Sequence, residues 1–267
     1  MFEFTCKTLL RAYDYLVVYL GLFWLGLLCL IYSVIAVLMF LCLPRDSGRR
    51  LGRLLLMWLF RLFLASLSLT RRCYFDLSEL DSLRHSPALI IAPNHPSLLD
   101  AVLIISRLPN VACVLKTELM NNLFLGIGAR FAGYIRSEPL RKMVTLARQN
   151  LNSGSHLLLF PEGTRTVVCP VNPLKGSISL IAYQAQAAVQ TVLIETDTRY
   201  LSKGWNLFCK PPLPIHYRLR LGRNFEAAGS KQDFMTKLDY YFRQELVQGS
   251  PFYPPNGLPT AIRQLYD

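Results

Sequence analysis

A run of 28 residues without a single charge, Leu16–Leu43, constrains this chain more than any other feature. As one α-helix it would be about 42 Å long, against a bilayer hydrocarbon core of about 30 Å. The run can therefore cross a membrane with some tilt, or break into two shorter helices that enter and return, with Gly21, Gly26 and Ser33 as places for the break. A cleaved signal peptide is disfavoured, because the run is far longer than the apolar core of such a peptide.

The charges on either side of this run predict its orientation. Four arginines lie within residues 45–53 with only Asp46 opposing them, whereas Lys7 and Arg11 before the run are offset by two acids. Positive charge collects on the cytoplasmic side of membrane segments. We therefore expect the rest of the chain on the cytoplasmic side of the cell inner membrane or an equivalent membrane.

A second apolar stretch, Leu54–Leu69, is interrupted by Arg61. It fits an amphipathic helix that lies in the membrane interface, with its arginines meeting anionic headgroups. It fits equally well a core helix of the domain that follows. On either interpretation, residues 1–72 are predicted to form an N-terminal region of membrane-anchoring and interfacial helices.

Composition supports contact with lipid. Hydrophobic residues make up 52% of the chain, and the formal net charge is +12. A basic chain can bind nucleic acid, anionic lipid or an acidic substrate, but no nucleic-acid-binding motif accompanies the charge. We expect an anionic membrane surface as a partner and no nucleic acid. The seven cysteines are scattered without a Cys-x-x-Cys pair, so neither a disulfide framework nor a metal site is predicted.

Residues 73–267 alternate short apolar runs with helical patterns, which predicts a cytoplasmic α/β domain with a mixed sheet flanked by helices. The expected strands are 88–92, 111–115, 134–135, 157–160, 189–194 and 214–221. The expected helices are 98–106, 139–150, 175–187 and 234–246, with a helix-to-turn region at 126–133.

His95 follows the first of these strands, and Asp100 comes five residues later. A carboxylate within hydrogen-bond reach of one imidazole nitrogen fixes the tautomer and leaves the other nitrogen able to take a proton from a hydroxyl. The pair therefore predicts a site that activates a hydroxyl group. The alternative is structural: Asp100 stands three residues after Ser97, the spacing of a helix-capping arrangement.

Two further polar clusters follow expected strands. Phe160-Pro-Glu-Gly-Thr-Arg165 comes directly after a buried run, and Arg136 follows a short strand. Gly163 lets the backbone approach a ligand closely, and a guanidinium can bind a phosphate with two parallel hydrogen bonds. Ligands commonly bind at strand ends in open α/β sheets. The alternative for each arginine is a solvated surface charge.

These residues resemble the glycerolipid acyltransferases, a family that includes the lysophosphatidic acid acyltransferases. Asn94–Asp100 is similar to the family's His-x4-Asp motif, Gly133–Arg136 to its second block, and Phe160–Arg165 to its third block in full. Lys175-Gly176 is similar to the stretch after the third block, with Leu174 in place of the usual aromatic residue. The fourth block is poorly matched, because Val189–Val192 lacks the usual proline.

The resemblance implies an enzyme that moves a fatty acyl group from acyl-CoA or acyl carrier protein to the hydroxyl of a lysophospholipid such as 1-acylglycerol-3-phosphate. It implies that His95 is the general base and that Asp100 orients it, with no cofactor and no metal. The residues that it assigns to substrate binding are Arg136, Glu162, Gly163, Thr164, Arg165 and Lys175, with the two arginines on the acceptor phosphate.

Three other functions stay open at this stage. The first is an acyltransferase of the same family with a non-phospholipid acceptor, such as an amino-acid lipid, a glycolipid or a polyene lipid. The second is a thioesterase or other hydrolase in which His95 activates water, although the chain has no Gly-x-Ser-x-Gly nucleophile motif. The third is a membrane-bound lipid binder without catalysis.

Overall fold

The computed structural model describes residues 2–248, except for the side chains of residues 2–7, 40, 123–125 and 248. The end of the predicted domain, residues 249–267, lies outside the described residues. The elements are α1 (Phe2–Cys42), α2 (Arg45–Leu69), β1 (Cys73–Asp76), the 3-10 helix η1 (Ser78–His85), β2 (Ile90–Pro93), α3 (Asp100–Ile105), β3 (Val111–Leu115), α4 (Thr117–Asn121), α5 (Leu123–Phe131), β4 (Ile135–Arg136), α6 (Leu140–Asn152), β5 (His156–Leu158), α7 (Ser177–Ala185), β6 (Val189–Thr196), β7 (Ile215–Phe225) and α8 (Lys231–Gln248).

The centre of the molecule is a seven-stranded sheet in the order β1-β7-β6-β2-β5-β3-β4. All neighbouring strands are parallel except β6 and β7, which are antiparallel. The predicted mixed sheet with flanking helices is therefore confirmed. The first strand, β1, was not predicted.

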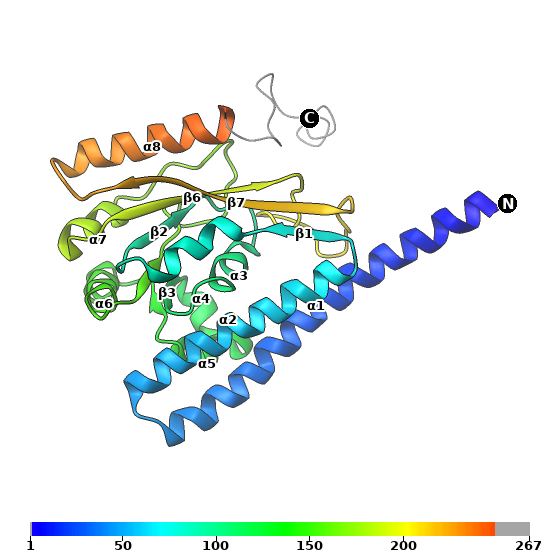
Figure 1. The fold of residues 1–267 in the computed structure, drawn as a ribbon, viewed down its shortest axis with the longest axis horizontal. Coiled ribbons are helices and arrows are strands. Elements are labelled where there is room, and N and C mark those ends of the chain that lie inside the picture. Colours follow the sequence, from blue (N-terminus) through cyan, green and yellow to red (C-terminus); the bar gives the residue numbers. More distant parts are fainter. Residues whose placement is uncertain (1, 249–267) are drawn as a thin grey trace.

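Helices cover both faces of the sheet, as Figure 1 shows. Consecutive residues of a strand point to opposite faces, so Ile91 on β2 packs in the core beneath α1, α2 and α3, whereas Ile90 packs in the core beneath α6, α7 and α8. Both are completely buried. This double burial explains why the central strands are continuous apolar runs in the sequence.

The N-terminal region is a helical hairpin, and α1 is one unbroken helix of 41 residues. Of the two alternatives that the sequence left open, the structure has the continuous helix and no break at Gly21, Gly26 or Ser33. The chain reverses only after Cys42, where Pro44 caps the N-terminus of α2. A proline fixes its own φ and lacks an N–H, so it suits the start of a helix better than the interior of one.

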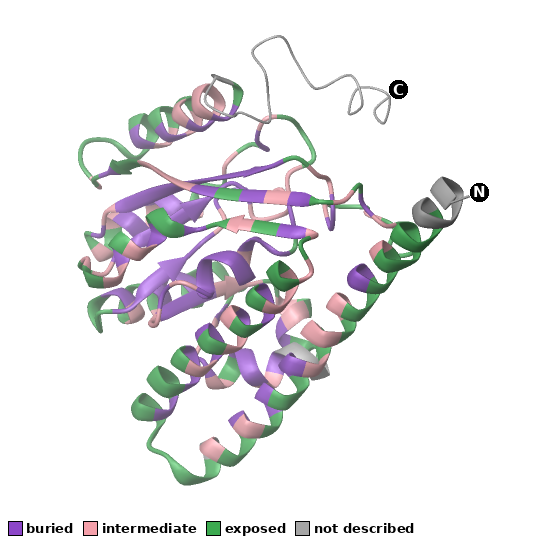
Figure 2. Ribbon diagram, turned by 45° about the vertical axis from the view of Figure 1, so that its right-hand side comes forward, coloured by how far each residue is buried: buried purple, intermediate pink, exposed green. Residues whose placement is uncertain are grey.

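Both hairpin helices are long and apolar enough to cross a membrane: an 18-residue window has a mean hydropathy of 2.5 within Thr8–Met39 and of 1.5 within Arg45–Leu69. The outer side of the hairpin is largely exposed (Figure 2). On α2, Phe63 is buried in the domain while Trp58 is 56% exposed. Helix α2 thus packs as a core helix on one side and presents an apolar surface on the other. The contact of that second side with a membrane interface stays a prediction.

A buried arginine fastens the hairpin to the sheet domain. Arg53 on α2 is 3% exposed and donates hydrogen bonds of 2.7–2.9 Å to four acceptors: Ala132 O, Asn110 Oδ1, Ser155 Oγ and Asn150 Oδ1. None of these acceptors is charged, so the guanidinium is held by dipoles alone. The hairpin and the sheet domain are therefore joined by a specific polar contact as well as by apolar packing.

Candidate active site

His95 lies just beyond the carboxyl end of β2. Strand β2 ends at Pro93, and the side chain of Asn94 continues its pairing with β6: Asn94 Oδ1 accepts from the Ile194 N–H at 2.7 Å, and Nδ2 donates to the Ile194 carbonyl at 3.0 Å. This side-chain bridge fixes the direction in which the chain leaves the sheet. His95 is therefore placed by the strand rather than by a mobile loop.

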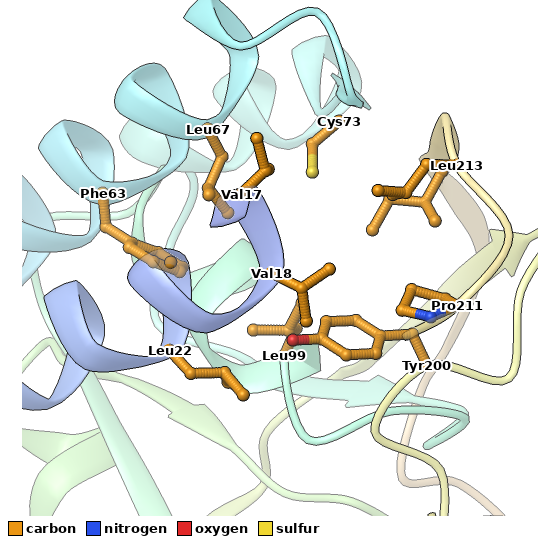
Figure 3. Close-up of a pocket in the computed structure, with 12 residues that line it drawn as sticks. Val17, Val18, Leu22, Phe63, Leu67, Cys73, Leu99, Tyr200, Pro211 and Leu213 are labelled. Atoms are coloured by element: carbon orange, nitrogen blue, oxygen red, sulfur yellow. The ribbon is translucent and has the colours of Figure 1, made fainter. Parts of the chain in front are cut away.

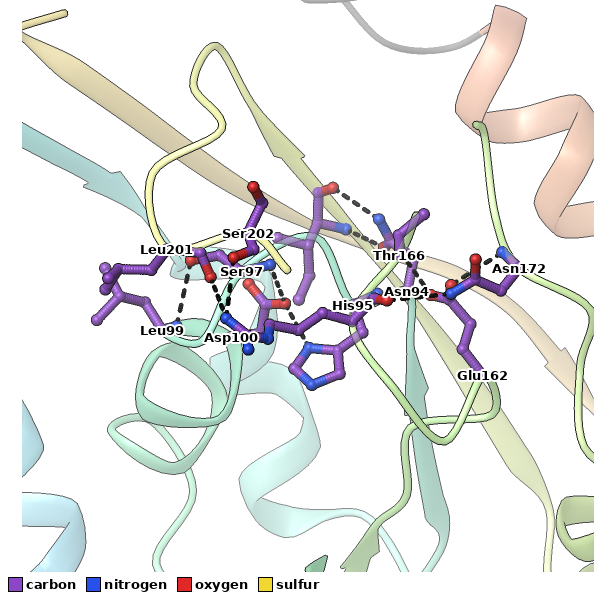
Figure 4. A network of polar contacts seen from close by, with 12 residues as sticks. Asn94, His95, Ser97, Leu99, Asp100, Glu162, Thr166, Asn172, Leu201 and Ser202 are labelled. Atoms are coloured by element: carbon purple, nitrogen blue, oxygen red, sulfur yellow. Dashed lines mark hydrogen bonds and ion pairs between the residues drawn. The ribbon is translucent and has the colours of Figure 1, made fainter. Parts of the chain in front are cut away.

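The predicted hydrogen bond between His95 and Asp100 is present. His95 Nδ1 is 2.8 Å from Asp100 Oδ2, and the same oxygen accepts the Ser97 N–H at 2.8 Å (Figure 4). The second contact has the spacing of a capping box, but α3 begins at Asp100 itself, with Leu99 as its N-cap and no side-chain hydrogen bond at that cap. The turn from Ser97 to Asp100 just before the helix therefore aims the carboxylate at the ring, and the helix-capping alternative for Asp100 is wrong.

Burial shapes the electrostatics of this pair. Asp100 is completely buried, whereas the His95 side chain is 16% exposed. Burial raises the pKa of Asp100, and the hydrogen bonds from His95 and Ser97 and the charge of Arg165 act against that increase. Because Nδ1 is taken up by the carboxylate, Nε2 is the ring nitrogen that is left for a substrate; it carries no hydrogen bond to the described part of the chain.

The imidazole also has a fixed plane. Its ring stacks on Phe160, with the ring centroids 3.8 Å apart and the planes 23° apart. Phe160 follows β5, the strand next to β2 in the sheet, so two neighbouring strand ends hold the ring. We did not predict a role for Phe160, although its place at the head of the Phe160–Arg165 motif was a usable signal.

Glu162 lies beside the pair and faces into the protein. It is 2% exposed, and both carboxylate oxygens accept hydrogen bonds: Oε1 from the His95 N–H and the Thr166 hydroxyl, each at 2.8 Å, and Oε2 from the Asn172 N–H at 2.9 Å. Thr166 N–H in turn donates to the His95 carbonyl at 2.7 Å. Glu162 therefore ties the motif's loop to the His95 backbone. Burial raises its pKa, and these three donors act against the increase.

The remaining residues of the third motif lie around this centre. Arg165 is half-buried and uses Nη1 to bond the carbonyls of Leu201 and Ser202 at 2.9 and 3.0 Å. Gly163 has φ +66, and a Cβ there would lie 2.6 Å from Lys175 Cε. The glycine thus permits both the left-handed backbone and the Lys175 side chain lying across it. Thr164 is partly exposed beside them.

Arg136 stands apart from this cluster. It is exposed at the end of β4, where Nη2 donates to Asn121 Oδ1 at 3.1 Å. Strand β4 is the third strand from β2 in the sheet order, which at normal strand spacing is about 14 Å. The structure therefore brings together His95, Asp100, Glu162, Gly163, Arg165 and Lys175, and places Arg136 on the same sheet edge but farther along it.

Three positioning residues were missed from the sequence: Asn94, Phe160 and Asn172. Asn172 is 6% exposed, and its side-chain oxygen accepts the N–H groups of Val167 and Val168, each at 3.0 Å. It lies in an irregular stretch between two prolines, where the sequence has no pattern that could have pointed to it.

A model of the acyltransferase family matches residues 75–195. Those residues contain the His95–Asp100 pair and the whole Phe160–Arg165 motif. Human 1-acyl-sn-glycerol-3-phosphate acyltransferase beta is 29% identical, in a match that covers 64% of this chain and 63% of that protein. The resemblance to the acyltransferases is therefore confirmed over residues 75–195.

The fold of this chain is also found in a solved structure. The crystal structure of the 1-acyl-sn-glycerophosphate (LPA) acyltransferase PlsC from Thermotoga maritima superposes with a TM-score of 0.65 and 17% sequence identity, over 88% of this chain and 95% of that one. The similarity extends beyond residues 75–195 of the family match. The match to the human relative spans only 63% of its length.

Proposed function

We propose that this chain is an acyltransferase that moves a fatty acyl group from an acyl thioester to the hydroxyl of a lysophospholipid such as 1-acylglycerol-3-phosphate. The observation that carries the proposal is the His95–Asp100 pair: a 2.8 Å contact between a partly exposed imidazole and a fully buried carboxylate. The names of the two similar proteins favour a lysophosphatidic acid acceptor. The donor is acyl-CoA or acyl carrier protein.

The chemistry follows from the orientation of the ring. Asp100 holds the proton on Nδ1, so Nε2 removes the proton of the acceptor hydroxyl as its oxygen attacks the thioester carbonyl. The C–S bond then breaks, and the leaving thiolate receives the proton from the imidazolium. General-base assistance of this kind is worth about 10²–10⁴ in rate. The thiolate is a good leaving group, so no covalent acyl-enzyme is required.

The acceptor phosphate needs positive charge near this centre. Arg165 and Lys175 supply it beside Gly163 and Thr164, and Arg136 adds a second guanidinium along the sheet edge. Arg165 keeps Nε and Nη2 for a ligand, since its hydrogen bonds within the described residues use Nη1. The buried contacts of Glu162 favour a different role from direct phosphate binding, namely to position His95 and the loop.

The helical hairpin fits this reaction. A single-chain acceptor resides in the bilayer, whereas the thioester donor arrives from water. An enzyme that joins them must hold its base at the interface, and α1 and α2 have the length and hydropathy to anchor it there. We propose that the hairpin is in the membrane and that the sheet domain lies on its cytoplasmic side.

The decisive experiment is an acceptor screen. The purified full-length chain is incubated with labelled acyl-CoA or acyl carrier protein and with lysophosphatidic acid, other lysophospholipids, and amino-acid, sugar or polyene lipids, and products are identified by mass spectrometry. We expect diacylated phosphatidic acid to be the main product. Transfer only to a non-phospholipid would reject the acceptor, and free fatty acid released at the same rate without any acceptor would identify a hydrolase.

A further inference from the structure

The loop between β6 and β7, residues 197–214, is unusually long and carries exposed apolar side chains. It has 18 residues, whereas antiparallel neighbours are normally joined by two to five residues, and longer loops are usually functional. Phe208 is 85% exposed and Leu207 is 56% exposed. Neighbouring apolar side chains exposed to water in a loop need an explanation, because they do not stabilise the fold and often mark a contact with a partner or a membrane.

One end of this loop is fastened to the candidate active site. Ser97 Oγ donates to the Tyr200 carbonyl at 2.9 Å, and the Leu98 N–H donates to the Leu201 carbonyl at 3.1 Å. Arg165 bonds the carbonyls of Leu201 and Ser202. The loop is therefore an ordered part of the surroundings of His95.

The other end of the loop lies against α1. Lys210 Nζ is 3.4 Å from Asp14 Oδ2 and 5.7 Å from the centre of the Tyr15 ring. Tyr200, Pro211 and Leu213 face Val17 and Val18 of α1 across a small apolar pocket, as Figure 3 shows. Tyr15 and Tyr19 stack on each other and are 45% and 38% exposed. The apolar surface of α1 thus continues into the loop.

The composition of the loop matches a membrane interface. Residues 197–214 include three basic residues and one acidic residue, Asp197, which pairs with His216 of β7. Trp205, Leu207 and Phe208 lie between Lys203 and Lys210. Aromatic rings flanked by lysines are the groups that favour the headgroup region of a bilayer, and anionic lipids attract the lysines. We propose that the β6–β7 loop is a second membrane contact, with Leu207 and Phe208 inserted at the headgroup–acyl boundary of an anionic bilayer.

This contact goes beyond anchoring by the hairpin. The proposed hairpin anchor alone would keep the sheet domain near a membrane, while the loop would also hold the segment that is bonded to Ser97 and Arg165 against the lipid. The inference does not depend on which acceptor is used, nor on catalysis, because it concerns where one exposed loop lies when the chain is in a bilayer.

Depth-dependent fluorescence quenching tests the proposal. In the full-length chain, Trp24, Trp58 and Trp205 are changed to Phe and a single reporter is introduced as Phe208→Trp. The protein is reconstituted in vesicles of phosphatidylglycerol and phosphatidylcholine, with or without bromine on the acyl chains. The matched control is Tyr240→Trp in the same background, because Tyr240 is 65% exposed on α8, on the other side of the sheet from the hairpin (Figure 1).

We expect brominated lipid to reduce the emission of the reporter at position 208 about twofold, as for a side chain 5–10 Å below the headgroups, and to leave the reporter at position 240 unchanged. Leu207→Trp in the same background should be quenched too, which guards against a local effect of one substitution. Absence of quenching at both loop positions, or equal quenching at position 240, would overturn the proposal.

Discussion

The substitution Glu162→Gln separates a positioning role of this residue from substrate binding. Glu162 is buried and its two oxygens accept from His95, Thr166 and Asn172. Glutamine has one oxygen. If that oxygen keeps the His95 and Thr166 donors, its NH₂ group faces the Asn172 N–H, and donor meets donor.

The lost bond to a charged acceptor is worth about 1.5–3 kcal/mol. Part of this loss is offset because a neutral amide is easier to bury than a carboxylate whose pKa burial raises. We expect a net destabilisation of about 2 kcal/mol, which lowers the thermal midpoint of a domain of this size by about 4–8 °C. Because the His95 backbone loses part of its support, kcat should fall about tenfold to a hundredfold, with little change in KM for the acceptor.

The assay is thermal unfolding in detergent together with steady-state acyl transfer. Glu195→Gln is the matched control, since Glu195 is 1% exposed but bonds Arg220 instead of the His95 backbone. It should lower the thermal midpoint without lowering kcat at a temperature where the protein is folded. An unchanged kcat with a strongly raised acceptor KM in Glu162→Gln would refute the positioning role and favour direct contact with the acceptor.

Two further predictions concern the anchoring of the hairpin and the thiols. Arg53→Met should destabilise the chain by about 3 kcal/mol or more in thermal unfolding, because it leaves buried acceptors on the sheet domain without a donor. The exposed control Arg50→Met should change the thermal midpoint little. Equal midpoints for the two variants would contradict the hydrogen-bond network of Arg53. Burial raises the pKa of Cys73 to about 12, so its thiol stays protonated at pH 8. A maleimide should therefore label the exposed Cys209 in the folded chain and Cys73 only after unfolding. Peptide mass spectrometry reads out the labelled positions. Labelling of Cys73 in the folded chain would contradict its placement.

The sequence predicts local elements well where a pattern is strong. Val111–Leu115 is a strand with the expected bounds, and the apolar face of residues 139–150 becomes α6. The missed β1 has only four residues, Cys73–Asp76, too few for a clear pattern, and it pairs with β7, more than 130 residues away. The sequence left open whether α1 is continuous or broken, because a glycine tolerates a helix as well as a break. Packing against α2 and α5 decides for the continuous helix.

The candidate site likewise contains some contacts that the sequence predicts and others that it does not. The His95–Asp100 contact spans five residues, so spacing predicts it. The contact from Glu162 to the His95 backbone spans 67 residues and goes to a main-chain N–H, which no side-chain motif encodes. Arg136 and Arg165 look alike in the sequence, yet one is exposed on β4 and the other is bonded to the β6–β7 loop. Their joint action on a phosphate stays a prediction.

The most direct test of the account is the rate of acyl transfer to lysophosphatidic acid by His95→Ala. The substitution shortens a partly exposed side chain and removes the group proposed as general base. We expect a protein that unfolds near the wild-type temperature with kcat lower by about 10²–10⁴, and a smaller loss in Asp100→Asn. A His95→Ala protein that transfers the acyl group at the wild-type rate would contradict the account.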